Sequence, residues 1–266
     1  VIRMNMMRFT TMKTKLRKYP SIFLILLLAI SSCFLTGCVN QHPKDSKKSS
    51  QGESVETMLE ITDPKEKQAV LNAKAKVKAL SGNPRIVATS PAVADICDKL
   101  DLDLVGVPKS SVSKIPSRYK KVKKVGLAMS PDMEIVSSLN PDWILAPSSL
   151  ETDLKPKFEE LKNTEYAFLN LRSVQGMYRS VQELGEIFGK QQEAEKMTKE
   201  FTTFYKSYTK RNKNKKHPKV LVLMGLPGSY VIATENSYVG SLVKLAGGEN
   251  VYQNTDQEFL TVNTED

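Results

Sequence analysis

The sequence is poor in the residue types and motifs from which enzymes build active sites. Among its 266 residues it has three cysteines and only two histidines, His42 and His217. No His/Cys cluster has metal-ligand spacing, no G-x-G-x-x-G follows the first expected strand, and there is neither a P-loop nor a G-x-S-x-G nucleophile elbow. Asp95 and Asp98 fit the solvated face of a helix. These absences argue against the alternative of an enzyme with a Rossmann-like fold.

The N-terminal segment lacks acidic residues, and its apolar run is too short to span a membrane. Its uncharged apolar run, Ile22 to Leu35, has about 14 residues, whereas a transmembrane helix needs roughly 20. A basic start followed by a short apolar run is typical of a cleaved secretory signal. The basic residues are Arg3, Arg8, Lys13, Lys15, Arg17 and Lys18.

The tetrapeptide Leu35-Thr36-Gly37-Cys38 follows that run and matches the bacterial lipobox. It predicts cleavage before Cys38, acylation of the Cys38 thiol and retention of the exported protein on the outer face of the cell membrane. The alternative is an ordinary signal peptide, or an uncleaved anchor, with an accidental cysteine.

Most of the positive charge belongs to the segment that we expect to be removed. The sequence has 39 basic and 29 acidic residues and a net charge of +10. Removing residues 1–37 takes away six basic residues, which leaves 33 basic residues and a net charge of +4. The composition is therefore weak evidence for a nucleic-acid partner. The basic cluster at 210–216 before Pro218 fits a helix C-terminus better than a nucleic-acid site.

Processing also removes Cys33 and blocks Cys38, so Cys97 is expected to be the one free thiol, and no intramolecular disulfide can form. Cys97 falls in an apolar helical pattern with Val93, Ile96 and Leu100, which predicts packing in the core.

The pattern of elements divides the sequence into five segments. We expect a signal peptide at 1–37, the lipidated cysteine and a polar tether at 38–83, an α/β lobe at 84–173, a helical segment at 174–216 and a partial second α/β lobe at 217–266. Within the tether, 39–60 is expected to be flexible. Pro64 to Leu80 is either a surface helix or more tether.

Strands alternate with helices in the first lobe, which predicts a parallel sheet covered by helices on its faces. Pro91 suits a first helical turn that Ser90 caps. The expected strands are 86–88, 104–107, 122–125, 143–146 and 166–169, and the expected helices are 91–100, 130–139 and 154–161.

A long helical stretch follows from Val174 to Arg211, with apolar residues at helical spacing and a bend at Gly189. Strands are then expected at 220–224 and 231–234, and a helix at 237–245. So few strands would leave sheet faces exposed, and we therefore expect the second lobe to be incomplete at Asp266.

One α/β lobe, one long helix and a second lobe behind a lipobox resemble the substrate-binding lipoproteins of iron-type ABC importers. Within that family the chain looks most like the haem receptors of the staphylococcal iron-surface-determinant system and its Gram-positive relatives. The resemblance covers about residues 84–266. The phrases that carry it are RIVATSPAVADICDKLDLDLVGVP (85–108), VGLAMSPDMEIVSSLNPDWILA (125–146) and HPKVLVLMGLPGSYVIATENSYVGSLVKLAGGENVY (217–252). The combination of Met129 with MGLPGSY narrows the resemblance to the haem-binding members of the family.

The resemblance implies two Rossmann-like lobes joined by a long α-helix, as in class III substrate-binding proteins, with the ligand in the cleft between them. Met129 matches an axial ligand of haem iron, and a second axial histidine is expected beyond Asp266. The helix start matches the backbone that receives haem propionates, at Thr89, Ser90, Ala92 and Val93. Tyr230 would face the ligand from the second lobe, and Glu134 and Glu265 would contact arginines on the permease.

The implied partners are the permease and ATPase of a haem importer, the membrane, and haem-donor surface proteins, for a monomeric receptor. The alternative cargo is a ferric siderophore or cobalamin, and the alternative fate is a truncated, non-functional product. Taken alone, Met129 is also consistent with packing, Ser90 with helix capping, and each glutamate with an ordinary exposed side chain. Because the second axial ligand would be missing, we expect weak or no stable haem binding by these 266 residues.

Overall fold

The structure is a computed structural model that describes residues 3–4, 55–226 and 228–261. Cys38, His42, Glu265 and nearly all of the expected signal peptide and flexible tether lie outside these residues. In the part of the chain that is described, no helix is both long and apolar enough to cross a membrane.

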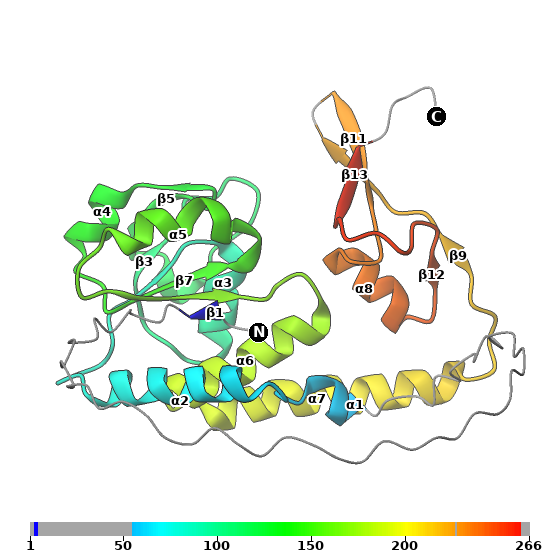
Figure 1. Cartoon of the computed structure of the whole chain (residues 1–266), viewed down its shortest axis with the longest axis horizontal. Helices are drawn as coiled ribbons and strands as arrows, with labels where there is room; N and C mark the ends of the chain where they lie inside the picture. Colours follow the sequence, from blue (N-terminus) through cyan, green and yellow to red (C-terminus); the bar gives the residue numbers. More distant parts are fainter. Residues whose placement is uncertain (1–2, 5–54, 227, 262–266) are drawn as a thin grey trace, which may run out of the picture. The chain divides into compact units, whose positions relative to one another are not determined.

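The first lobe is built on one six-stranded sheet with the strand order β1-β8-β7-β2-β3-β4 (Figure 1). The five strands from β8 to β4 are parallel, as predicted, whereas β1 pairs antiparallel with the edge of β8. Since β1 belongs to the expected signal peptide, β8 would form that edge after processing. The strands are β1 (Arg3–Met4), β2 (Ile86–Ala88), β3 (Leu104–Val107), β4 (Lys123–Lys124), β7 (Trp143–Pro147) and β8 (Glu165–Leu169).

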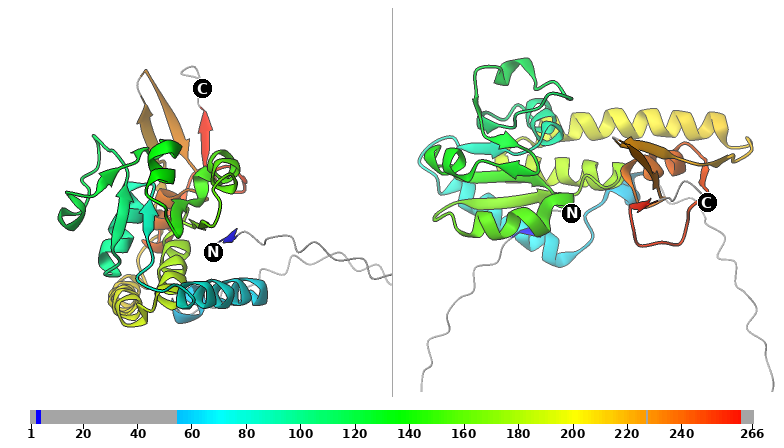
Figure 2. Two further views of the ribbon diagram at one scale, coloured as in Figure 1. Left: turned by 90° about the vertical axis from the view of Figure 1, so that its left-hand side faces the viewer. Right: turned by 90° about the horizontal axis from the view of Figure 1, so that it is seen from above.

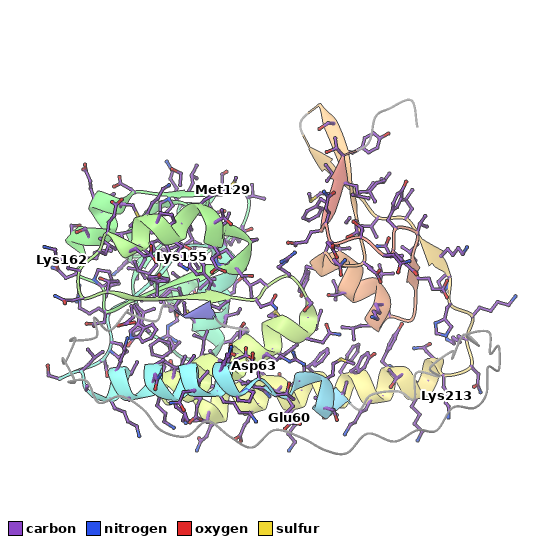
Figure 3. The ribbon with its side chains drawn as sticks, viewed as in Figure 1. Glu60, Asp63, Met129, Lys155, Lys162 and Lys213 are labelled. Carbon is purple, nitrogen blue, oxygen red and sulfur yellow. The ribbon has the colours of Figure 1, made fainter. Side chains whose placement is uncertain are left out.

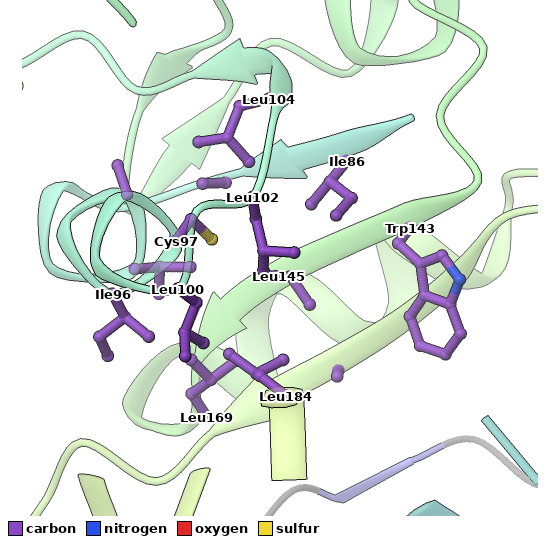
Figure 4. Close-up of a cluster of buried hydrophobic side chains, with 14 of the residues drawn as sticks. Ile86, Ile96, Cys97, Leu100, Leu102, Leu104, Trp143, Leu145, Leu169 and Leu184 are labelled. Carbon is purple, nitrogen blue, oxygen red and sulfur yellow. The ribbon is translucent and has the colours of Figure 1, made fainter. Parts of the chain in front are cut away.

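Helices cover both faces of this sheet, and side chains alternate between two apolar clusters. Ile86 and Ala88 of β2 pack in the cluster that contains Cys97, while Val87 between them packs in the other. Figure 4 shows the first cluster around Cys97. The covering helices are α3 (Pro91–Lys99), α4 (Met133–Ser138) and α5 (Glu151–Glu159), with short 3₁₀ turns η1 (Ser117–Tyr119) and η2 (Ser148–Leu150).

The expected bend at Gly189 separates two helices, α6 (Val174–Phe188) and α7 (Gln191–Asn212). Ser173 caps α6 by accepting a hydrogen bond from the Gly176 N–H at 3.0 Å. Gly189 ends the helix with a left-handed φ of 70°, which a residue without a Cβ adopts at little cost.

Two helices also form inside the segment that we expected to be tether. They are α1 (Val55–Leu59) and α2 (Pro64–Lys78), so Pro64–Leu80 takes the helical alternative. Figures 1 and 2 show α2 running beside the α6–α7 pair. Val70 and Ala73 of α2 are buried in the cluster around Cys97, and Lys74 forms an ion pair with Glu186 of α6. The Arg179 guanidinium holds α1 by donating to the Met58 carbonyl at 2.6 Å.

The second lobe contains a short parallel pair and an antiparallel sheet. Strands β12 (Glu249–Asn250) and β9 (Lys219–Val220) are parallel, with α8 (Tyr238–Leu245) between them in the sequence. Strand β11 (Ser229–Ala233) pairs antiparallel with β10 (Leu223–Leu226) and β13 (Phe259–Thr261). The expected strand at 220–224 is therefore two strands. Most of the large apolar side chains that are exposed in the described residues lie between Leu221 and Phe259.

Candidate functional site

The candidate site lies along one edge of the first-lobe sheet. Because β8, β7, β2, β3 and β4 are parallel, their carboxyl ends share one edge, which is where open α/β sheets bind ligands. Thr89 follows β2 there, Ser148 follows β7 and Asn170 follows β8. The segment after β4 carries Met129. The sequence patterns thus bring the predicted ligand residues of the first lobe to a single edge.

The loop from β2 into α3 is held by its own polar groups. Thr89 is fully buried and its N–H donates to the Leu145 carbonyl at 3.0 Å. Ser90 caps α3, because its hydroxyl accepts from the Val93 N–H at 3.2 Å. Ala92 is the exposed member of the four predicted propionate contacts, and it lies in the first turn, where backbone N–H groups lack partners within the helix. Ala92 is therefore the position of the four best placed to meet an anion.

Met129 sits in the tight turn of a small hairpin formed by β5 (Gly126–Leu127) and β6 (Ser130–Pro131). Gly126 has a φ of 95°, and a Cβ there would lie 2.8 Å from the Asp132 nitrogen, so the hairpin requires glycine. Met129 is 74% exposed, so it packs into neither apolar cluster of the first lobe. Figure 3 shows it on the side of the first lobe away from α2. A neutral, polarizable thioether is thus held out on a constrained turn.

Two polar cavities share Asn170 and Arg172 at this edge. One has a volume of about 590 Å³ and is lined largely by residues of α5. The other has a volume of about 380 Å³ and is lined in part by residues of the second lobe. Arg172 pairs with Glu258, which directly precedes β13, at 2.6 Å. Sequence analysis missed Arg172, although its place just after an expected strand could have suggested it.

A third cavity, of about 400 Å³, is mainly apolar and borders Ala92. Burial, and then the neighbouring carboxylate of Asp98, raise the pKa of Asp95 at its rim. Such a cavity suits the apolar body of a ligand better than its charged groups. The side chains lining it are Ala92, Asp95, Ile96, Lys99, Leu171, Met177, Met197 and Tyr238.

The remaining predicted residues are spread over the molecule. Glu134 is exposed in the first turn of α4, and Tyr230 is half-buried in β11 opposite Gly225. His217 lies at the start of the second lobe, where its Nδ1 is 2.6 Å from the Gly247 carbonyl, and it lines none of the three cavities. Within residues 3–4, 55–226 and 228–261, no three His, Cys, Asp or Glu side chains are grouped to hold a metal ion.

The parallel sheet with its ligand edge, followed by helices α6 and α7, matches the architecture expected for a class III substrate-binding protein. The chain belongs to the periplasmic binding protein family, whose model matches residues 86–266. This finding confirms the fold class predicted from the sequence.

Its relatives include a haem uptake protein. The high-affinity haem uptake system protein IsdE of Staphylococcus aureus is 41% identical over 186 residues, which cover 70% of this chain and 63% of that protein. The structure of S. aureus IsdE complexed with haem is 40% identical, with a TM-score of 0.64 over 70% of this chain and 71% of the other. An ABC transporter substrate-binding protein from Listeria monocytogenes EGD-e is 46% identical, with the same TM-score over 69% of this chain and 70% of the other. The chain thus spans less than two thirds of the curated relative's length.

Proposed function

We propose that this protein is an exported, lipid-anchored receptor that binds haem between its lobes and delivers it to an ABC permease. The observation that carries the proposal is the exposed Met129 thioether, presented on a constrained turn at the ligand edge. The identity with the S. aureus haem uptake protein supports haem as the cargo.

Besides Met129, features at α3 suit the other parts of haem. Haem combines an apolar macrocycle with two anionic propionates and an iron that accepts soft axial ligands. The apolar cavity beside Ala92 suits the macrocycle, and the first turn of α3 suits a propionate. Thr89, Ser90 and Val93 shape this turn, and Tyr230 would close the site from the second lobe. The second axial ligand is expected from a histidine beyond Asp266.

The other partners follow from the predicted anchor and from the two glutamates that the family resemblance singles out. Cys38 would carry the acyl chains that hold the receptor on the outer face of the membrane. Glu134 and Glu265 would meet basic residues of the permease, which works with its ATPase. Surface haem donors would load the receptor, which we expect to act as a monomer.

The test is an absorbance titration of the purified protein with haemin, run beside Met129→Ala. A Soret band that shifts and saturates in the wild type, and that needs roughly tenfold more haemin in the variant, supports ligation through Met129. Leu127→Ala is the matched control, because Leu127 is 58% exposed on the same hairpin. Equal binding by all three proteins would contradict a role for Met129.

If the 266 residues give no Soret shift, the titration is repeated on a form extended through the region that the curated relatives possess. If only the extended form binds haem, the result supports a second axial ligand in the added region. No binding by the extended form would exclude haem and favour the alternative cargo, a ferric siderophore or cobalamin. Quenching of tryptophan fluorescence is a poor readout of ligand binding for this protein. Trp143 is 1% exposed and begins β7, at the opposite edge of the sheet from the candidate site.

A further inference from the structure

The segment that joins β3 to β4 places an unusual excess of one charge on a single flank of the first lobe. Residues 108–124 contain seven basic side chains and no acidic one. All seven residues are exposed. Their summed charge exceeds the net charge of +4 expected for the whole processed chain, so the positive charge is distributed very unevenly over the molecule. They are Lys109, Lys114, Arg118, Lys120, Lys121, Lys123 and Lys124.

This segment is firmly attached to the lobe. Tyr119 is 2% exposed and its hydroxyl donates to the Leu102 carbonyl at 2.5 Å. Arg118 reaches Asp101 and Asp103, each at 2.8 Å. Ile115 and Val122 pack against the apolar cluster around Cys97. The inward side chains thus hold the backbone while the lysines point outward.

Only Arg118 of the seven takes part in an ion pair among the described residues, which leaves the six lysines as a basic flank. Lys123 and Lys124 form the edge strand β4, where lysines discourage pairing with another sheet. That reason does not apply to the other four, which lie outside any strand. The tip of the same segment carries Val112, which is 95% exposed. A basic surface with an apolar tip is typical of a surface that rests on anionic lipid.

We propose that this basic flank, Lys109, Lys114, Lys120, Lys121, Lys123 and Lys124 with Val112 at its tip, docks on the anionic headgroups of the membrane surface. The proposal rests on the proposed function, because lipid anchoring keeps the lobe close to that surface. The flank reaches the ligand edge, since the Lys109 N–H donates to the Gly126 carbonyl at 2.6 Å, at the base of the hairpin that carries Met129. Docking would therefore orient the ligand edge relative to the bilayer.

The first experiment compares two fourfold variants of the full chain for partition onto vesicles of phosphatidylcholine with 30% phosphatidylglycerol. One replaces Lys109, Lys114, Lys120 and Lys121 by Gln. The matched control replaces Lys196, Lys199 and Lys210 of α7 and Lys213 at its C-cap, which are also exposed, so both variants lose the same charge and keep the same N-terminal segment. Each lysine near an anionic surface contributes about fivefold. We expect the flank variant to partition at least tenfold more weakly than the control variant, and equal losses overturn the proposal.

The second experiment maps lysine acetylation of the unmodified chain by mass spectrometry. On anionic vesicles, compared with pure phosphatidylcholine vesicles, Lys114 and Lys120 should become protected while Lys162 and Lys213, both labelled in Figure 3, should not. Uniform protection, or none at the flank, overturns the proposal. Neither experiment uses haem, so failure here is separate from failure of haem binding.

Discussion

Two sulfur-containing side chains of the first lobe lie in opposite environments, and the contrast decides their chemistry. Met129 is largely exposed on a turn and can offer its thioether to a ligand. Cys97 is fully buried in α3 against the sheet. Desolvation by burial raises the pKa of the Cys97 thiol to about 12. The thiolate needed for nucleophilic or redox chemistry is therefore scarce at neutral pH, and Cys97 acts as an apolar core residue.

Cys97 should not react with iodoacetamide while the protein is folded. With a pKa near 12, about one thiol in ten thousand is ionised at pH 8, and the side chain is also shielded from reagent. Peptide mass spectrometry of protein treated at pH 8, with and without urea, checks this and distinguishes Cys97 from Cys33 and Cys38. Comparable labelling of Cys97 in both conditions would show that α3 does not pack as described.

At the scale of elements, the contact between α2 and α6 makes part of the expected tether belong to the folded lobe. Lys74 of α2 pairs with Glu186 of α6, and Lys76 pairs with Glu165 at the start of β8, 2.5 Å apart. The hydrogen bond from Lys74 lowers the pKa of the Glu186 carboxyl below its ordinary value of 4.5. The folded state thus favours the ionised carboxylate.

Acid should weaken this contact. Because the pKa of Glu186 is lower in the folded than in the unfolded state, its stabilisation is fully present above about pH 4.5 and is lost as the pH falls through the folded-state pKa. The pair is partly exposed, so the effect stays below about 1 kcal/mol. Thermal unfolding from pH 7 to pH 3 should be less acid-sensitive in Lys74→Met than in the wild type. Lys67→Met, an exposed control on the same helix, should follow the wild type.

Buried, apolar strands could be predicted from the sequence, and two-residue strands could not. The strands Ile86–Ala88 and Leu104–Val107 have the expected bounds, because buried β-branched runs between turn residues leave few alternatives. The β5–β6 hairpin was missed, since two-residue strands have no periodicity. Met129 was found through its resemblance to a family motif, whereas its constrained turn depends on the φ of Gly126. The basic flank was not singled out from the sequence, and its outward orientation depends on the burial of Tyr119.

At the scale of the whole molecule, the folding unit is larger than the region that defines the family. The family model begins at residue 86, yet Leu59, Val70 and Ala73 before it are buried. These side chains cover α6 and the first-lobe core. A boundary drawn from the family match alone would expose that apolar surface.

A chain that starts at residue 84 should therefore be less stable than one that starts at residue 53. Burying a Leu or Val side chain contributes about 1.5–3 kcal/mol, so the loss of Leu59 and Val70 should lower the free energy of unfolding by at least about 3 kcal/mol. Urea denaturation of both chains gives this difference. Leu59→Ala in the longer chain provides an independent check, with an expected loss of about 2–5 kcal/mol. Equal midpoints would mean that α1 and α2 do not stabilise the lobe.

The docking of α1 and α2 also has a consequence for how far the receptor could travel on the proposed lipid anchor. With both helices docked, residues 38–54 separate the proposed anchor from α1, and a chain of that length spans at most about 60 Å. Releasing α1 and α2 would add residues 55–83 to that reach. A shorter tether confines the lobe to a smaller volume, and this raises its effective concentration at any permease within reach. The two short helices would then govern how often receptor and permease meet, without touching either the ligand or the permease.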